Sequence, residues 1–213
     1  MLAIEHQRIT YPGCQQPALD DVSVTFSEGE RVALIGSNGA GKSTLLKALA
    51  ASAHPQKDGT PAIAFVPPDD PVALPLSCRD YVMLGRTPHL SAWRRPSAED
   101  QAAVEAALSS VEGTFLSDRR MDAISSGERR RMALALALAT GAPVLLLDEP
   151  TAHLDVATRR AFYELLRRSG RTLVMSVHEF PLPVDFFTRI IWLEGGRIRA
   201  DGDPATILSD YLA

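Results

Sequence analysis

The stretch GSNGAGKST at positions 36–44 constrains the fold more than any other part of the sequence. It follows RVALI (31–35), an apolar run typical of a buried parallel strand, and it leads into STLLKALAAS (43–52), which has helical spacing. The pattern G-x-x-x-x-G-K-[ST] between a strand and a helix predicts a loop whose backbone N–H groups surround phosphate oxygens. The members of this predicted nucleotide site are Gly36, Ser37, Asn38, Gly39, Ala40, Gly41, Lys42, Ser43 and Thr44.

Two side chains of this loop have specific chemical roles in such a pattern. We expect the Lys42 ammonium to reach the β- and γ-phosphates of a nucleoside triphosphate, and the Ser43 hydroxyl to ligate Mg²⁺. The alternative is an accidental glycine turn, which the flanking strand and helix disfavour. The loop therefore predicts binding of a nucleoside triphosphate with Mg²⁺.

A pair of carboxylates ends the second informative stretch, VLLLDE (144–149). Four apolar residues predict a buried strand, and α/β proteins bind ligands at the carboxyl ends of their strands. We expect Asp148 to hold Mg²⁺ through water, and Glu149 to orient or deprotonate the attacking water. The alternative is that the two acids merely end a strand at the surface.

Strands and helices alternate along the rest of the chain. This alternation around a Gly-rich turn predicts an α/β core with a mostly parallel sheet. Together with the phosphate-binding loop, we expect the P-loop nucleoside triphosphatase (RecA-like) class, with an N-terminal antiparallel β part and an inserted α-helical subdomain. We expect one domain over residues 1–213, with a nucleotide-binding core at about 1–76 and 141–213 and a helical subdomain at about 77–140. The predicted strands are 2–9, 22–26, 31–36, 62–67, 144–149 and 172–179, followed by a hairpin that turns at Gly195 and Gly196.

Composition excludes several classes of protein. The 26 acidic and 22 basic residues leave a formal charge of −4, which disfavours a dedicated nucleic-acid binder. The two cysteines, Cys14 and Cys78, have no metal-ligand spacing and are expected to be reduced thiols. The first residues alternate like a strand and lack the pattern of a signal peptide, and no apolar run reaches the roughly 18 to 20 residues that a bilayer requires.

The stretch ISSGERRRM (124–132) resembles the LSGGQ or LSGGE signature of the ATP-binding subunits of ABC transporters. The other motifs follow in the order of that family. Tyr11 resembles the aromatic residue that stacks on adenine, DEPTAHLD (148–155) resembles the second carboxylate motif with its D-loop, and His178 resembles the switch histidine. The resemblance covers essentially the whole chain.

This resemblance implies an ATP hydrolase that works as a homodimer, with two ATP molecules sandwiched between the copies. Ser125, Gly127 and Glu128 of one copy would complete the γ-phosphate site of the other, and Asp155 would couple the two sites. His178 would hydrogen-bond the γ-phosphate and the attacking water. The alternatives are a structural role for His178 and simple turn packing for Tyr11.

The sequence departs from this family in three places. Pro68 stands where a glutamine that coordinates Mg²⁺ is expected, Ser126 replaces the first signature glycine, and the segment 54–62 omits a strand and short helix. Asp69 or Asp70 could supply a substitute carboxylate, or both could be exposed turn residues. These departures predict slow hydrolysis more than weak binding.

The stretch RDYVMLGRTPH (79–89) resembles importer subunits for iron–siderophore, haem and cobalamin-type metal chelates. This resemblance implies integral membrane permease subunits as partners, a substrate-binding protein acting indirectly, no nucleic acid, and a cytoplasmic location on the inner face of the cell membrane. Tyr81, Met83 and Trp93 are candidates for docking the permease or for ordinary subdomain core. The alternatives are an exporter, another ABC cargo, or a non-transport regulatory module that binds ATP and hydrolyses it slowly.

Overall fold

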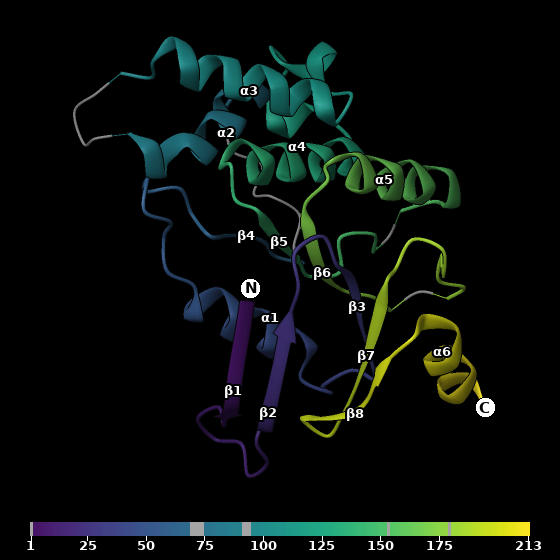
Figure 1. Ribbon diagram of the computed structural model, residues 1–213. Helices are drawn as coiled ribbons and strands as arrows, with labels where there is room; N and C mark the ends of the chain where they lie inside the picture. Colours follow the sequence, from purple (N-terminus) through teal and green to yellow (C-terminus); the bar gives the residue numbers. More distant parts are fainter. Residues whose placement is uncertain (1, 69–74, 91–94, 153, 179) are drawn as a thin grey trace. The chain divides into compact units, whose positions relative to one another are not determined.

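A computed structural model describes residues 2–68, 75–90, 95–152, 154–178 and 180–213 (Figure 1). The chain forms two compact units, each made of segments that are separate in sequence. The first unit comprises Met1–Ala53, Leu146–Ala152 and Arg171–Ala213, and the second comprises His54–Leu145 and His153–Gly170. The division at about 77 and 140 that the sequence indicates stays a prediction.

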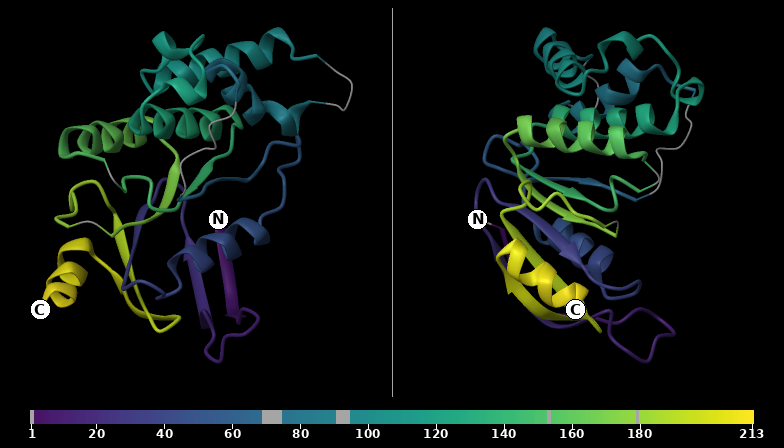
Figure 2. Two further views of the ribbon diagram at one scale, coloured as in Figure 1. Left: turned by 180° about the vertical axis from the view of Figure 1, so that it is seen from behind. Right: turned by 90° about the vertical axis from the view of Figure 1, so that its right-hand side faces the viewer.

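The first unit begins with an antiparallel pair of strands, β1 (Leu2–Ile9) and β2 (Leu19–Phe26), as predicted (Figure 2). The ladder is irregular near His6, whose backbone has a positive φ of 47°. Alternate residues of β2 are buried and exposed, which is the pattern of a strand with one face on a core.

Parallel strands make up the centre of the first unit. The strand β3 (Arg31–Ile35) pairs in parallel with β6 (Thr172–Ser176) on one side and with β7 (Arg189–Glu194) on the other. Because β3 is covered on both faces, its last four residues are completely buried, as the continuous apolar run predicts. The antiparallel strand β8 (Arg197–Gly202) joins β7 through the predicted hairpin. The predicted α/β class with a mostly parallel sheet is confirmed.

Two helices belong to the first unit. The helix α1 (Lys42–Ser52) starts at the Gly-rich loop and buries its leucines completely. The helix α6 (Pro204–Leu212) was not anticipated from the sequence, although Asp203 caps its first amides and Pro204 occupies its first turn. Tyr211 of α6 packs edge-on against Trp192 of β7, with ring centroids 5.1 Å apart.

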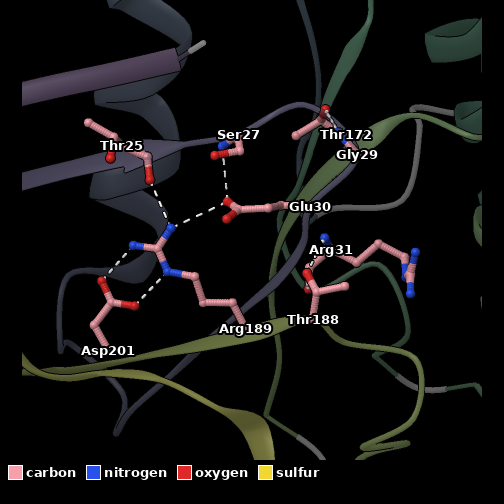
Figure 3. Close-up of polar contacts among 9 residues, drawn as sticks. All are labelled: Thr25, Ser27, Gly29, Glu30, Arg31, Thr172, Thr188, Arg189 and Asp201. Atoms are coloured by element: carbon pink, nitrogen blue, oxygen red, sulfur yellow. Dashed lines mark hydrogen bonds and ion pairs between the residues drawn. The ribbon is translucent and has the colours of Figure 1, made fainter.

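A polar network links the amino ends of β3 and β7 to the carboxyl ends of β2 and β8 (Figure 3). The Arg189 guanidinium donates to both carboxylate oxygens of Asp201, at 2.6 and 2.7 Å, and to the Thr25 carbonyl oxygen at 2.9 Å. It also pairs with Glu30 at 3.3 Å, just before β3. The same side chain therefore links β2, β7, β8 and the start of β3.

The second unit is mainly helical. It contains the strand β4 (Ile63–Val66) and the start of β5 (Val144–Leu147), and the described part of residues 53–62 holds no helix or strand. Its α-helices are α2 (Cys78–Met83), α3 (Ala98–Ser110), α4 (Ser126–Ala139) and α5 (Val156–Arg168). Its 3-10 helices are η1 (Leu84–His89), η2 (Thr114–Leu116) and η3 (Met121–Ala123).

A buried ion pair joins three helices of the second unit. The Arg86 side chain in η1 donates to the Asp100 carboxylate in α3 at 3.0 Å and to the Ala139 carbonyl oxygen in α4 at 3.0 Å. Asp100 also accepts from the backbone N–H and the hydroxyl of Ser97, which caps α3. These hydrogen bonds, those from Ser97 first, lower the pKa of Asp100 to about 2.

Candidate nucleotide-binding site

The Gly-rich loop adopts a backbone that only glycine accommodates at two positions. Gly36 has a φ of 143°, and a Cβ there would collide with the carbonyl oxygen of Leu193. Gly41 has a φ of 106°, and a Cβ there would collide with the carbonyl oxygen of Ala18. The glycines of the motif are therefore required both for left-handed conformation and for close approach of neighbouring backbone.

Lys42 is the first residue of α1 and is only 5% exposed. Its ammonium donates to the carbonyl oxygens of Gly36 at 2.8 Å and Ser37 at 3.0 Å, so the side chain lies along the inside of the loop. Burial lowers the pKa of Lys42, while the negative charges of Glu149 and Asp148 oppose that shift. The structure thus places one positive charge within the loop that is predicted to hold phosphates.

Asp148 follows β5 and is completely buried. One of its carboxylate oxygens, Oδ1, accepts hydrogen bonds from the hydroxyls of Ser43 at 3.0 Å and Ser176 at 2.7 Å. The other, Oδ2, is buried and has no hydrogen-bond partner among the described residues. An orphaned carboxylate oxygen next to Ser43 is a chemically suitable position for a divalent cation, because Mg²⁺ prefers oxygen ligands.

Glu149 and His178 come from the ends of neighbouring strand segments and meet at the site. The Nε2 atom of His178 lies 2.7 Å from Oε1 of Glu149, and about a third of each side chain is exposed. Both side chains therefore reach solvent while remaining in contact with each other. This is the arrangement expected of groups that act on a substrate rather than of groups sealed in a core.

Glu149, His178 and the Gly-rich loop line an open pocket of about 750 Å³ in the first unit. Tyr11 lies at its margin with 44% of its surface exposed, and its hydroxyl is 3.3 Å from the hydroxyl of Thr44. An exposed aromatic ring beside the loop is consistent with a surface on which a base can stack. The pocket is lined by Tyr11, Ala18, Asn38, Gly39, Gly41, Lys42, Ser43, Thr44, Glu149 and His178.

The predicted signature residues lie in the second unit, where they form the start of α4. Ser125 is the N-cap of this helix, and its hydroxyl accepts from the Glu128 N–H at 3.3 Å. The Glu128 carboxylate in turn accepts from the Ser125 N–H at 2.8 Å and from the Ser125 hydroxyl at 2.7 Å, completing a capping box. These hydrogen bonds lower the pKa of Glu128. Gly127 is partly buried within the first turn.

Asp155 also caps a helix of the second unit. Its carboxylate accepts from the backbone N–H groups of Ala157 and Thr158, both at 3.0 Å, and from the Thr158 hydroxyl at 2.6 Å. The bonds from Thr158 and Ala157 lower the pKa of Asp155. Ser125 and Asp155 are both exposed, so their local bonds leave part of each side chain open to solvent.

Pro68, which stands in place of the expected glutamine, lies within the described residues. The carbonyl oxygens of Pro67 and Pro68 accept hydrogen bonds from Arg130 of α4, at 3.3 Å for Pro67, so both prolines are held through their backbone. Tyr81 and Met83 are half-buried, and burial raises the pKa of Tyr81. Asp69, Asp70 and Trp93 lie outside the described residues.

Ser176 was not singled out from the sequence, although it contacts both acidic residues at the site. Its hydroxyl bonds to the Asp148 carboxylate and to the backbone N–H of Glu149. The available signal was a polar residue inside the apolar strand TLVMSV, two positions before His178.

None of the helices in the described ranges is long and apolar enough to cross a membrane.

Comparison with known proteins places this arrangement in a family. A family model described as ABC transporter matches residues 19–152. The chain is 36% identical to the hemin import ATP-binding protein HmuV of Nocardia farcinica over 220 residues, covering 94% of this chain and 75% of that protein. It is 33% identical to the achromobactin transport ATP-binding protein CbrD of Dickeya dadantii, covering 100% of this chain and 86% of that protein.

Solved structures give the same result. A chain of a transporter described as metal-chelate type, in an inward-facing conformation, matches with a TM-score of 0.86 and 27% identity, covering 99% of this chain and 86% of that one. The dimeric ABC transporter cassette MJ0796 matches with a TM-score of 0.79 and 25% identity, covering 96% and 99%. Together with the loop, the paired carboxylates and the signature helix, these similarities show that the chain belongs to the ABC transporter family, as an ATP-binding subunit.

Proposed function

We propose that this chain hydrolyses ATP to energise the import of a metal chelate such as an iron–siderophore, haem or cobalamin. The observation that carries the hydrolytic role is the convergence of Lys42, Ser43, Glu149 and His178 on one pocket, with Asp148 hydrogen-bonded to Ser43. The cargo class is supported by the names of the relatives, which specify hemin import and achromobactin transport, and by the likeness to a metal-chelate type transporter.

Each residue of the pocket has a distinct role in the proposed reaction. The loop amides and the Lys42 ammonium bind the phosphates and stabilise the charge that develops on the transferred group. Glu149 accepts the proton of the attacking water, and His178 donates a hydrogen bond to the γ-phosphate. Tyr11 stacks on the adenine ring. The residues proposed to contact the phosphates are Gly36, Ser37, Asn38, Gly39, Ala40, Gly41, Lys42, Ser43 and Thr44.

Mg²⁺ fits this site because Asp148 has a buried carboxylate oxygen without a protein partner, next to the Ser43 hydroxyl. The described residues hold no group of three His, Cys, Asp or Glu side chains that could bind a metal by themselves. The proposed cation is held by Ser43, Asp148 and the nucleotide together, since Mg²⁺ binds few protein ligands besides substrate phosphates. When bound, Mg²⁺ neutralises phosphate charge in the transition state.

The second unit is proposed to act on the ATP of another copy of the chain. Ser125 and Gly127 at the start of α4 present a helix N-terminus, which favours negatively charged ligands. Glu128 orients Ser125 through the capping box, and Asp155 lies at the start of α5. The dimeric structure of the related cassette MJ0796 supports a homodimer. Permease subunits, and a substrate-binding protein indirectly, are the proposed further partners at the cytoplasmic face of the membrane; nucleic acid is not.

Affinity purification tests the transport assignment. A tagged Glu149→Gln variant, purified with ATP from detergent-solubilised membranes of the source cells, should bring down an integral membrane protein with many helices. Uptake of haem or a ferric siderophore by vesicles containing that complex then identifies the cargo. Recovery of soluble partners alone, with no membrane protein, would contradict the importer assignment.

A regulatory module that binds ATP and turns it over slowly is the second candidate, favoured by Pro68. Proline lacks the side-chain oxygen and the N–H of the glutamine expected there. We expect Pro68→Gln to raise the turnover of the isolated chain several-fold, measured as phosphate release. The matched control is Pro67→Ala, since the Pro67 carbonyl is also held by Arg130. Equal or lower turnover in Pro68→Gln would show that Pro68 does not limit hydrolysis.

A further inference from the structure

Ser176, the last residue of β6, bridges the two acidic residues that follow β5. Its side chain is completely buried. The hydroxyl donates to Oδ1 of Asp148 at 2.7 Å and accepts the backbone N–H of Glu149 at 2.8 Å. A serine hydroxyl has one donor and two acceptor positions, so both bonds form at once. One small side chain therefore contacts the proposed metal-binding residue and the proposed general base.

The bond to Glu149 matters because this residue has an unusual backbone. Its φ is 47°, in the left-handed region that residues other than glycine rarely adopt. The hydrogen bond from the Glu149 N–H to Ser176 holds the peptide in this orientation, and the side chain then reaches to 2.7 Å from His178. Without the Ser176 hydroxyl, the Glu149 N–H would lose its hydrogen-bond acceptor, and the strained left-handed backbone of Glu149 would lose a stabilising contact.

The bond to Asp148 sets which carboxylate oxygen remains available. Oδ1 accepts from Ser176 and from Ser43, whereas Oδ2 has no partner among the described residues. Two hydroxyls on one oxygen fix the rotation of the carboxylate, because turning it would break both bonds. Ser176 thereby helps to keep Oδ2 directed away from the protein's own donors.

Thr172, at the other end of β6, provides an internal comparison. It is also buried, at 5% exposure, and its hydroxyl accepts the backbone N–H of Gly29 at 2.9 Å (Figure 3). The chemistry is the same as at Ser176, namely a strand hydroxyl that accepts a backbone N–H. The location differs, since Thr172 lies at the amino end of the strand and lines no part of the pocket.

We propose that Ser176 is a positioning residue for ATP hydrolysis, acting through the Glu149 peptide and the Asp148 carboxylate. This inference rests on the proposed function, because it assigns a partner to the proposed catalytic base. It predicts that removing the hydroxyl impairs the chemical step and the use of Mg²⁺, but leaves the phosphate-binding loop intact.

The test compares Ser176→Ala with Ser176→Thr, which keeps the hydroxyl, and with Thr172→Val, which removes a hydroxyl of the same kind far from the pocket. We expect Ser176→Ala to lower kcat about 10-fold, as the loss of hydrogen bonds to a charged group and to a buried N–H implies. The KM for ATP should stay within about twofold, since the loop is unchanged. The Mg²⁺ concentration for half-maximal turnover should rise. Ser176→Thr should recover most of the kcat, and Thr172→Val should match the wild type.

A readout independent of turnover is hydrogen exchange of the Glu149 amide in the nucleotide-free protein. This amide should exchange faster in Ser176→Ala than in the wild type, because its acceptor is gone. Thr172→Val should leave it unchanged. Should Ser176→Ala not fold, Ser176→Cys gives the same measurements, since a thiol of similar size is a much weaker hydrogen-bond partner.

The outcomes separate this inference from the proposed function. A kcat and a Glu149 amide exchange in Ser176→Ala equal to those of Thr172→Val would overturn the inference, provided that Glu149→Gln loses turnover in parallel. Turnover like that of the wild type in Glu149→Gln would overturn the role of Glu149 itself, and the positioning role with it. A selective loss of kcat, with faster exchange at Glu149 and rescue by Ser176→Thr, would support the inference.

Discussion

The two units hold their proposed site residues in different ways. In the first unit, Asp148 accepts hydrogen bonds from Ser43, 105 positions away, and from Ser176, 28 positions away. In the second unit, Asp155 accepts from Thr158, three positions away. One set of contacts exists only when distant segments come together, whereas the other forms within a single helical turn.

This difference shows what each unit can do alone. The first unit assembles a charged lysine, an acid and a histidine around one pocket, with a second, buried acid bonded to Ser43, so we expect it to bind nucleotide without further residues. The second unit presents capped helix starts whose exposed side chains are satisfied by their own helix. We expect these residues to act on ATP only when they contact the nucleotide bound to another copy of the chain, as in the proposed dimer. The predictions below test this contrast.

The largest effect is expected for Lys42→Met. The substitution removes the one charged donor within the loop while retaining an unbranched side chain of similar length. We expect turnover to fall by about 100-fold or more, because a preorganised donor aimed at developing charge is lost. Phosphate release at saturating ATP measures this. Lys47→Met, at an exposed position of the same helix, should retain turnover; an equal loss in both variants would contradict the specific role of Lys42.

Gly41→Ala should break the loop of the first unit. The added Cβ meets the Ala18 carbonyl and the residue is held at a φ of 106°. We expect a loss of about 1–3 kcal/mol in the free energy of unfolding, the typical cost of such strain, and weaker ATP binding by calorimetry. Gly59→Ala in the second unit is the control, because its φ is 85° but no atom lies within 4 Å of the new Cβ. The contrast fails if Gly59→Ala destabilises as much and also weakens ATP binding.

Removing a cap of the second unit should affect stability and turnover separately. Ser125→Ala or Asp155→Ala should lower the free energy of unfolding by about 0.5–2 kcal/mol, as loss of an N-cap does. ATP affinity of the monomer should stay unchanged. Asp203→Ala, which removes the matching cap of α6, is the control for stability. If the dimer forms as proposed, turnover falls in Ser125→Ala and Asp155→Ala but not in Asp203→Ala; equal turnover in all three would contradict the dimer role.

The smallest effect concerns acid stability of the second unit, where Asp100 is held by Ser97 and Arg86. The pKa of Asp100 is about 2 in the folded chain, below the ordinary value of 3.8. The unfolded chain therefore binds more protons between pH 4 and pH 2, so stability contributed by Asp100 is present above that range and is lost as the pH falls through it. Asp100→Asn should flatten the fall in melting temperature over this range. Asp122→Asn is the comparison, because Arg120 also lowers the pKa of Asp122 but in an exposed ion pair; an equal flattening there would contradict a special role for the buried pair.

Much of the fold was predictable because its signals are local. The buried strand before the loop, the helix after it and the hairpin at Gly195 and Gly196 were all confirmed. Apolar runs and turn residues act over a few positions, so one sequence suffices to find them. The C-terminal helix α6 was missed although Asp203 and Pro204 mark its start; its packing of Tyr211 against Trp192 of β7 is a tertiary contact that no local pattern encodes.

For the site, the sequence by itself determined the phosphate loop, the carboxylate pair and the signature helix, because each motif is a short pattern with fixed spacing. Only the tertiary structure decided which of these residues touch. Ser176 ends β6, where the parallel register sets it opposite Leu34 of β3, and its hydroxyl contacts Asp148 and Glu149, which follow β5. Contacts between residues 28 or 105 positions apart depend on strand order and register, which the packing of the whole core selects and which no local pattern encodes.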